Sequence, residues 1–252
     1  MLKHISRLGA AMAMVGLTAA FAGGASAANL VQNGDFNSPG AATAILLNQG
    51  STFITGWTNQ DTFTGYIPAG QTPDQTWQCC LNGSAGPGYG VNNGMVGPPS
   101  GNASVVIDGT EGFGPGGGFG YIEQSIGGLV SGQTYTLSYW FAGSQENGAG
   151  GATTQSFEVN LGDQSWTSPV IDVAANGFTP WQEVTQTFTW DGVGNALQFV
   201  SVGSGEPAFT LLADVSLTGG VPEASTWAMI VAGFAGLGFL ARARRKAAVA
   251  VA

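Results

Sequence analysis

Between residues 28 and 220 the sequence contains no lysine, arginine or histidine. Fourteen of the 15 acidic residues lie within this cation-free stretch, and Glu223 is the exception. The formal charge of −9 therefore averages an acidic middle with two basic ends. A wholly acidic surface repels nucleic acids and anionic membranes, so we expect no nucleic-acid partner. The positive residues are Lys3, Arg7, Arg242, Arg244, Arg245 and Lys246, and the one histidine is His4.

The missing residue types exclude most catalytic machinery. Without histidine no Ser-His-Asp or Cys-His arrangement can form. Without lysine or arginine there is no Schiff base and no phosphate clamp. Only carboxylate chemistry of the glycosidase kind remains open, with Asp108, Glu111 and Glu123 close together in the sequence. We therefore expect a protein that is not an enzyme, and a carboxylate-based glycoside hydrolase is the least favoured alternative.

Cysteine is nearly absent, because Cys79 and Cys80 are the only two and they are adjacent. A long-range disulfide within one chain is thereby excluded, and so is a zinc site of the usual His/Cys type. A strained vicinal disulfide, an intermolecular bridge and two free thiols stay open. We favour the vicinal disulfide, because an oxidising compartment would act on two thiols that are always neighbours.

Long apolar runs occur only at the two ends. Residues 1–27 read as a signal peptide, with a basic start, an apolar run over Leu8–Phe21 and a small-residue cleavage site ending at Ala27. Ala224–Ala241 offers 18 uncharged residues, a helix of roughly 27 Å, which is just enough for a bilayer core. The basic cluster after it predicts that residues 247–252 are cytoplasmic and that the acidic middle is exported.

The residues before this predicted transmembrane helix resemble a known sorting signal. The motif consists of Val221, Pro222, Glu223, Trp227 and Ala228. Residues 221–246 as a whole are similar to the PEP-CTERM tails of Gram-negative bacteria, although Ala224 stands where the family has a second proline. The resemblance implies a precursor tethered to the inner membrane, recognition by an exosortase, cleavage near the motif, and release to the cell surface or extracellular matrix.

Residues 28–220 are the size of one domain and show alternating rather than helical periodicity. Many short strands with glycine-rich turns predict an all-β fold, a jelly-roll-like antiparallel β-sandwich. The expected strands are Ala103–Ile107, Tyr121–Ile126, Gln133–Phe141, Ser156–Leu161, Gln186–Trp190, Ala196–Val202 and Phe209–Leu217.

Four segments of this domain resemble the galactose-binding-like jelly rolls of carbohydrate-binding modules. They are an opening strand at Asn29–Phe36, Ile122–Gln124, Leu129–Leu137 and a closing strand at Leu211–Leu217. The resemblance implies that the domain binds polysaccharide. Aromatic side chains that could stack on sugar rings are Trp57, Trp77 and Tyr89, with packing in the core as the alternative. A structural or adhesive matrix protein without a small ligand is the other function left open.

The same resemblance suggests a structural calcium ion near the terminal strands. Asp35, Asn37 and Asp214 are the candidate ligands, since hard cations take carboxylate and carbonyl oxygens from loops. Such modules often carry glutamate where Asn37 stands, so one carboxylate ligand is missing. The alternative is that Asn33-Gly34-Asp35 only shapes a turn.

Overall fold

The computed structural model describes residues 27–71, 96–145, 151–175, 177–205, 208–219 and 230–237. One compact unit spans Ala27–Val221, and the two ends of the chain form a second unit. In the second unit the described residues are helical over 230–237. Among the residues that can be described, none belongs to a helix with the length and hydropathy needed to cross a membrane. Residues 1–26 of the predicted signal peptide and the whole sorting motif lie outside the described residues.

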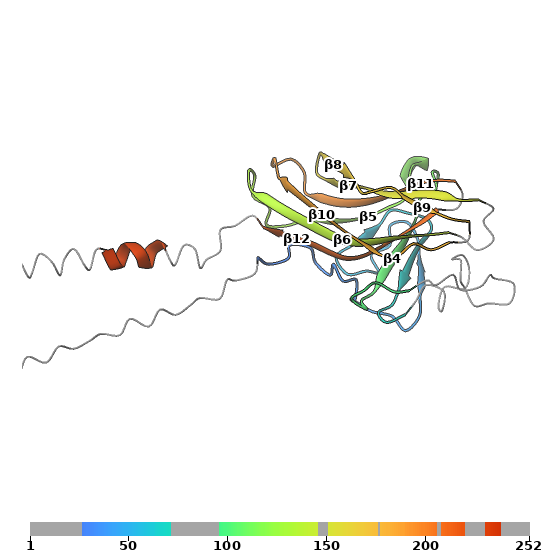
Figure 1. Ribbon diagram of the computed structural model, residues 1–252, viewed down its shortest axis with the longest axis horizontal. Helices are drawn as coiled ribbons and strands as arrows, with labels where there is room; N and C mark the ends of the chain where they lie inside the picture. The colour runs from blue at the N-terminus through green and yellow to red at the C-terminus, as the bar shows by residue number, and fades with distance from the viewer. Residues whose placement is uncertain are drawn as a thin grey trace, which may run out of the picture. The chain divides into compact units, whose positions relative to one another are not determined.

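The Ala27–Val221 unit is a sandwich of two antiparallel sheets, visible as two layers in Figure 1. This confirms the predicted all-β antiparallel sandwich. The first sheet has the order β1 (Ile45–Leu47), β3 (Thr64–Ile67), β4 (Ser104–Asp108), β12 (Ala208–Gly219), β6 (Thr134–Gln145), β10 (Gln182–Thr189). The second has the order β2 (Thr58–Asn59), β5 (Tyr121–Ser125), β11 (Ala196–Ser204), β7 (Thr153–Leu161), β8 (Gln164–Thr167), with β9 (Ile171–Val173) also paired to β7. A 3-10 turn, η1, covers Pro115–Gly117.

The main core lies between the sheets and is rich in aromatic rings. Alternation along β6 sends Tyr139 inward, where its ring meets Phe199 of β11 at 5.0 Å and 78°. Phe157 of β7 meets Phe199 at 5.7 Å and 84°. Edge-to-face pairs of this kind add to the free energy gained by burying the rings. The period-2 alternation seen in the sequence therefore builds this core directly.

A second apolar cluster lies on the outer face of the first sheet. Val106 of β4 and Leu211 of β12 are cross-strand partners and are fully buried, as is Phe209. Phe178 and Trp181 pack against this cluster from the loop before β10. The expectation of alternation over Phe209–Leu217 is therefore wrong for its first half, because here both faces of β12 are covered.

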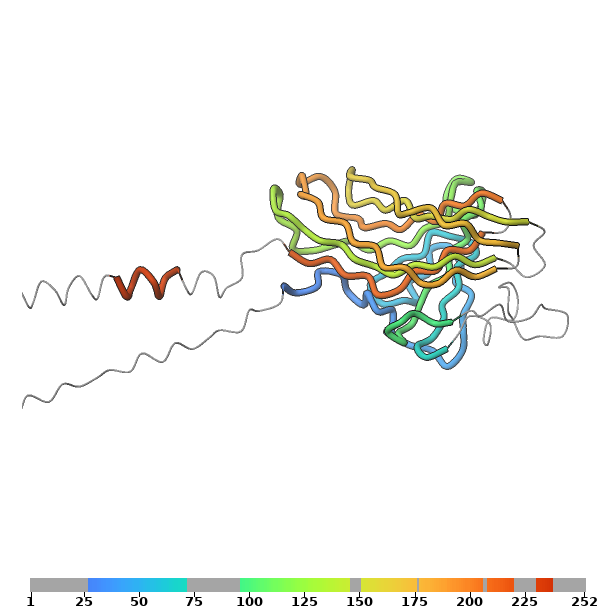
Figure 2. Tube along the Cα trace, viewed as in Figure 1, coloured from blue at the N-terminus to red at the C-terminus, as the bar shows by residue number. Residues whose placement is uncertain are grey.

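The segment Asn29–Phe36, expected to be the opening strand, forms turns instead. Asn33 and Phe36 have φ angles of 50° and 56°, which break an extended path. The segment is nevertheless held against the last strand, since Leu30 N donates to Leu217 O at 2.8 Å. Figure 2 shows this first described stretch, in blue, running beside the end of β12.

Buried glutamine amides join parts that are distant in the sequence. Gln155 on β7 is fully buried and accepts a hydrogen bond from Ser144 N on β6 at 3.2 Å, so it ties the second sheet to the first. Such a side chain offers both donors and an acceptor and can imitate strand pairing. A comparable glutamine, Gln124, holds the N-terminal segment and forms part of the site below.

Candidate functional site

The outer face of the second sheet is polar and open to solvent. Along β5, Ile122 and Gln124 point inward, whereas Tyr121, Glu123 and Ser125 point outward. The burial pattern of β11 alternates in the same way over most of its length. One row across three strands pairs Thr58 of β2 with Glu123 and Glu123 with Gln198 of β11. This row brings hydroxyl, carboxylate and amide groups together on one surface.

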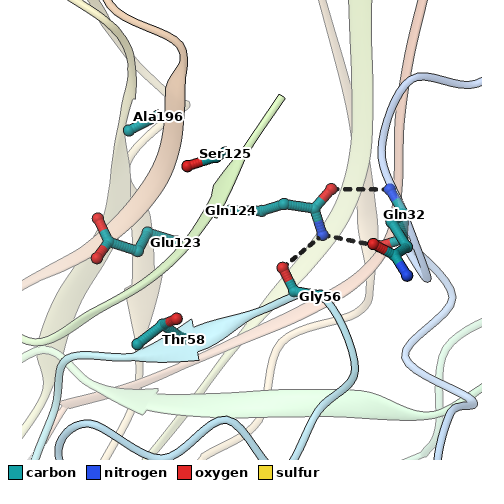
Figure 3. Close-up of a pocket in the computed structure, with 7 residues that line it drawn as sticks. All are labelled: Gln32, Gly56, Thr58, Glu123, Gln124, Ser125 and Ala196. Atoms are coloured by element: carbon teal, nitrogen blue, oxygen red, sulfur yellow. Dashed lines mark hydrogen bonds between the residues drawn. The ribbon is translucent and has the colours of Figure 1, made fainter. Parts of the chain in front are cut away.

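A hollow of about 320 Å³ lies at the end of this row (Figure 3). Among the residues that the structure describes, no positive group and no aromatic ring lines it, so it offers hydrogen bonds rather than a stacking platform. Its lining residues are Gln32, Gly56, Thr58, Glu123, Gln124, Ser125 and Ala196.

Glu123 is the one charged residue of the lining, and two amides fix its carboxylate. Gln60 Nε2 donates to Oε1 at 3.2 Å, and Gln198 Nε2 donates to Oε2 at 2.9 Å. Gln60 directly follows β2 and Gln198 lies on β11, and these strands flank β5, so the carboxylate is held from both sides. Each oxygen keeps a lone pair that can accept a hydrogen bond from a ligand hydroxyl.

Gln124 points the other way and builds the floor of the hollow, as Figure 3 shows. Its Oε1 accepts from Gln32 N at 2.7 Å, and its Nε2 donates to Gln32 O at 2.8 Å and to Gly56 O at 3.0 Å. A Cβ at residue 56 would lie 3.0 Å from Gln124 Nε2, and the φ of Gly56 is 84°. Glycine is therefore required for the close approach that seals the floor.

Tyr121 lies two residues before Glu123 on the same side of β5. Desolvation raises the pKa of its phenol, and the nearby Glu123 carboxylate raises that pKa further. The hydroxyl therefore stays protonated at neutral pH and can donate a hydrogen bond. Tyr121 is the aromatic residue that this strand places next to Glu123.

Of the three aromatic residues expected to contact sugar, the structure describes Trp57, which is not part of this surface. Trp57 is 2 % exposed, and its ring lies 5.3 Å from Phe36 and 6.3 Å from Phe199. Its indole Nε1 donates to Asn33 O at 3.2 Å. Trp57 therefore belongs to the core rather than to a ligand-binding surface. Trp77 and Tyr89 lie outside the described residues, as do Cys79 and Cys80.

The three residues expected to bind calcium are brought together, but through amides. Asn37 Nδ2 donates to Asp35 Oδ2 and to Asn102 Oδ1, each at 3.0 Å. Asn102 Nδ2 in turn donates to Asp214 Oδ1 at 2.7 Å. N–H donors thus face the oxygens that a cation would need. Among the side-chain oxygens of Asp35, Asn37 and Asp214, Asp214 Oδ2 is the one that is buried without a hydrogen-bond partner in the described part of the chain. No group of three acidic, histidine or cysteine side chains suited to a metal occurs in the described ranges. This arrangement does not fit a calcium ion.

The carboxylates that would form a glycosidase pair lie on three different elements. Asp108 is 2 % exposed on β4 of the first sheet, where its Oδ1 accepts from Thr110 N at 2.7 Å. Glu123 lies on β5 of the second sheet. Glu111 is exposed in the loop before η1.

Sequence reasoning did not single out Gln60 or Gln198, and it named Gln124 only as the last residue of the Ile122–Gln124 segment, without a role in a site. Glutamine has no motif of its own, and its role depends on which strand lies next to it. One local signal existed, because Gln124 occupies an inward position of an alternating strand, and an inward polar residue needs internal hydrogen bonds.

Comparison with known proteins gives structural likeness only. No protein-family model matches this chain. No curated protein matches it either. A carbohydrate-binding module in complex with β-1,4-galactotriose is 13 % identical, covers 76 % of this chain and 99 % of its own, and has a TM-score of 0.40. A xylan-binding domain from Paenibacillus barcinonensis is 12 % identical, with coverage of 73 % and 100 % and a TM-score of 0.37.

A third similar structure is the enzymatically active domain of a tailspike protein from bacteriophage CBA120. It is 13 % identical, covers 76 % of this chain but 21 % of its own, and has a TM-score of 0.36. Because all three TM-scores are low, the likeness assigns neither a ligand nor an activity to this chain.

Proposed function

We propose that the Ala27–Val221 unit is a non-enzymatic module that binds polysaccharide on the outer face of its second sheet. The observation that supports this most is Glu123, whose carboxylate is fixed by Gln60 and Gln198 beside a polar hollow. A preorganised acceptor flanked by amides suits a ligand that has many hydroxyls, because each hydroxyl can both donate and accept.

The charge of the unit narrows the ligand class. Residues 28–220 hold no positive side chain, so phosphates, nucleic acids and polyanionic polymers meet only repulsion. A neutral polysaccharide meets no such repulsion. Hydrogen bonds from its hydroxyls to Glu123 would be charge-assisted and stronger than neutral ones.

A glycan array with the Ala27–Val221 unit tests this proposal. The unit contains both sheets and both apolar clusters, so its fold is complete without the chain ends. We expect binding to a neutral polysaccharide and an affinity loss of about tenfold or more for Glu123→Gln, since a hydrogen bond to a charged group contributes about 1.5–3 kcal/mol. Glu111→Gln is the matched control and should bind normally. Absence of binding to every glycan would contradict the proposal.

We further propose that the protein is exported and sorted by its tail to the cell surface or extracellular matrix, with an exosortase as partner. The supporting features are the cation-free middle between basic ends and the Val221–Ala228 motif. Intact-mass measurement of the released protein tests this. A mature form that lacks Arg242–Lys246 is expected, whereas a form that retains them would rule out cleavage of the tail.

A further inference from the structure

Strand β10 ends the first sheet with an unusually long free edge. It has eight residues, Gln182–Thr189, and in the described part of the chain β6 is its one neighbouring strand. The other strands at sheet ends are far shorter, with three residues in β1, two in β2 and four in β8. Short edge strands limit pairing with other chains. This protection is missing at β10.

The direction of the β10 amides follows from the residue after the strand. Trp190 N donates to Gln133 O at 3.0 Å, and Trp190 O accepts from Gly132 N at 2.8 Å, so both groups face the β6 side. Successive residues of a strand direct their backbone groups to opposite sides. The backbone N–H and C=O groups on the open side therefore belong to Glu183, Thr185, Thr187 and Thr189.

Two contacts agree with this assignment. Gln164 Nε2 donates to Thr189 O at 3.0 Å, and Gln186 Nε2 donates to Thr187 O at 3.1 Å. Both carbonyls are thus reached from the open side, and each keeps a second lone pair. The four outward N–H groups have no acceptor within the described residues.

The usual protections of an edge strand are also missing. The pairing of β10 with β6 runs without a bulge from Gln182 to Thr189. The strand contains no proline, and the whole unit has no lysine. Thr185, Thr187 and Thr189 are exposed and β-branched, a residue type that favours extended pairing. Glu183 is the single charged residue of the strand.

We propose that β10 pairs antiparallel with β10 of a second copy of this chain, about a two-fold axis at Gln186. This register sets Thr185 opposite the partner's Thr187 and Glu183 opposite the partner's Thr189. The two Glu183 carboxylates then lie at opposite ends of the ladder, so the like charges are kept apart. The edge is complementary to itself, as a two-fold interface requires, and the two first sheets become one continuous sheet.

Sedimentation of the Ala27–Val221 unit at concentrations up to about 1 mM tests the pairing. We expect a monomer–dimer equilibrium. Thr187→Pro removes an outward N–H but no hydrogen bond to β6, a position where an edge strand accepts proline. It should weaken the dimer at least tenfold. Thr187→Val keeps the N–H and should dimerise like the wild type. Melting midpoints of both variants show whether the fold is intact.

Amide hydrogen exchange of the wild-type unit provides a second readout that needs no variant. The Thr185 and Thr187 amides should exchange fast in dilute samples and more slowly as the concentration rises. A unit that stays monomeric at all concentrations overturns the proposal. So does a dimer whose Thr185 and Thr187 amides exchange at an unchanged rate, because it would use another surface. Protection gained only with an added extended peptide would identify a different occupant and also overturn self-pairing.

Discussion

The two sheets differ in how their outer faces meet the surroundings. On the first sheet, the outer side chains of β4 and β12 include Val106, Phe209 and Leu211, which are buried beneath Phe178 and Trp181. On the second sheet, the outer side chains of β5 and β11 are polar or half-exposed and surround a hollow. The comparison teaches that the first sheet is covered over β4 and β12, whereas β5 and β11 of the second sheet leave a polar face with a hollow free for a ligand. The covered part of the first sheet, over β4 and β12, instead contributes to stability.

The largest expected effect comes from emptying the covered face. Leu211→Ala removes a fully buried side chain, so we expect a loss of about 2–5 kcal/mol in the free energy of unfolding. Val200→Ala on the outer face of β11 removes a half-exposed side chain and should cost well under half as much. Urea unfolding of both variants checks the contrast. Equal losses would show that the two faces are not differently covered.

Two glutamines on neighbouring strands allow the next comparison. Gln124 points inward and makes three hydrogen bonds to Gln32 and Gly56, whereas Gln198 points outward and contacts Glu123. Gln124→Ala removes a buried side chain and its three hydrogen bonds to backbone groups of Gln32 and Gly56, so we expect a loss of about 1–3 kcal/mol in the free energy of unfolding. Gln198→Ala should change stability little but weaken polysaccharide binding. The measurements are urea unfolding and glycan affinity, and the reverse pattern would move the site away from Glu123.

A smaller effect concerns pH and the buried carboxylate of Asp61. Burial raises the pKa of Asp61 above its ordinary value of 3.8, although hydrogen bonds from Phe63 N and Thr64 Oγ1 oppose the rise. Between 3.8 and the raised folded value, the folded state holds more protons than the unfolded chain. The contribution of Asp61 to the free energy of unfolding therefore falls as pH rises through this window.

Replacing Asp61 should remove that dependence. We expect Asp61→Asn to show a flatter decline of unfolding free energy from about pH 4 upward than the wild type, because the variant side chain does not titrate. The exposed Asp172→Asn serves as control and should keep the wild-type slope. Urea unfolding at a series of pH values gives the answer. An unchanged slope in Asp61→Asn would mean that the wild-type carboxyl is not the titrating group.

The smallest expected effect is none at all. The side-chain amides of Asn37 and Asn102 donate hydrogen bonds to Asp35 Oδ2, Asn102 Oδ1 and Asp214 Oδ1, and Asp214 Oδ2 is left without a partner. Because donors already face these oxygens, neither calcium nor EDTA should shift the thermal midpoint. Asn102→Ala should lower the midpoint equally in both conditions. A midpoint that rises with calcium would show that the amides yield their places to an ion.

Most strands can be predicted from local alternation in the sequence, but which segment covers the outer face of a sheet cannot. Strand β5, most of β11, residues 134–141 of β6 and residues 157–161 of β7 alternate in both sequence and structure, because there one face is buried and the other is not. Consecutive apolar residues such as Leu211-Leu212 indicate that both faces are buried. What lies over the outer face is a loop that contains Phe178 and Trp181, and this depends on tertiary contacts that no local pattern records.

The candidate site was predictable only in its chemistry. The absence of cations pointed away from nucleic acids and anionic membranes, and that inference rests on the sequence alone. The position of Glu123 between Gln60 and Gln198 depends on β2 and β11 lying on either side of β5. Trp57 was a predicted sugar-binding residue but lies in the core. An aromatic residue in a loop-rich stretch is suited to the core as well as to a binding surface, so the sequence does not distinguish the two.

The central place of β12 has a mechanical consequence. This last strand of the sandwich lies between β4 and β6 and is hydrogen-bonded to both. A pulling force applied through the residues after Gly219 would act along the strand axis. The ladder bonds on both sides would then be loaded together in shear rather than opened one after another. A module held or dragged by its C-terminal end would thus resist extraction through the strand that bears the load.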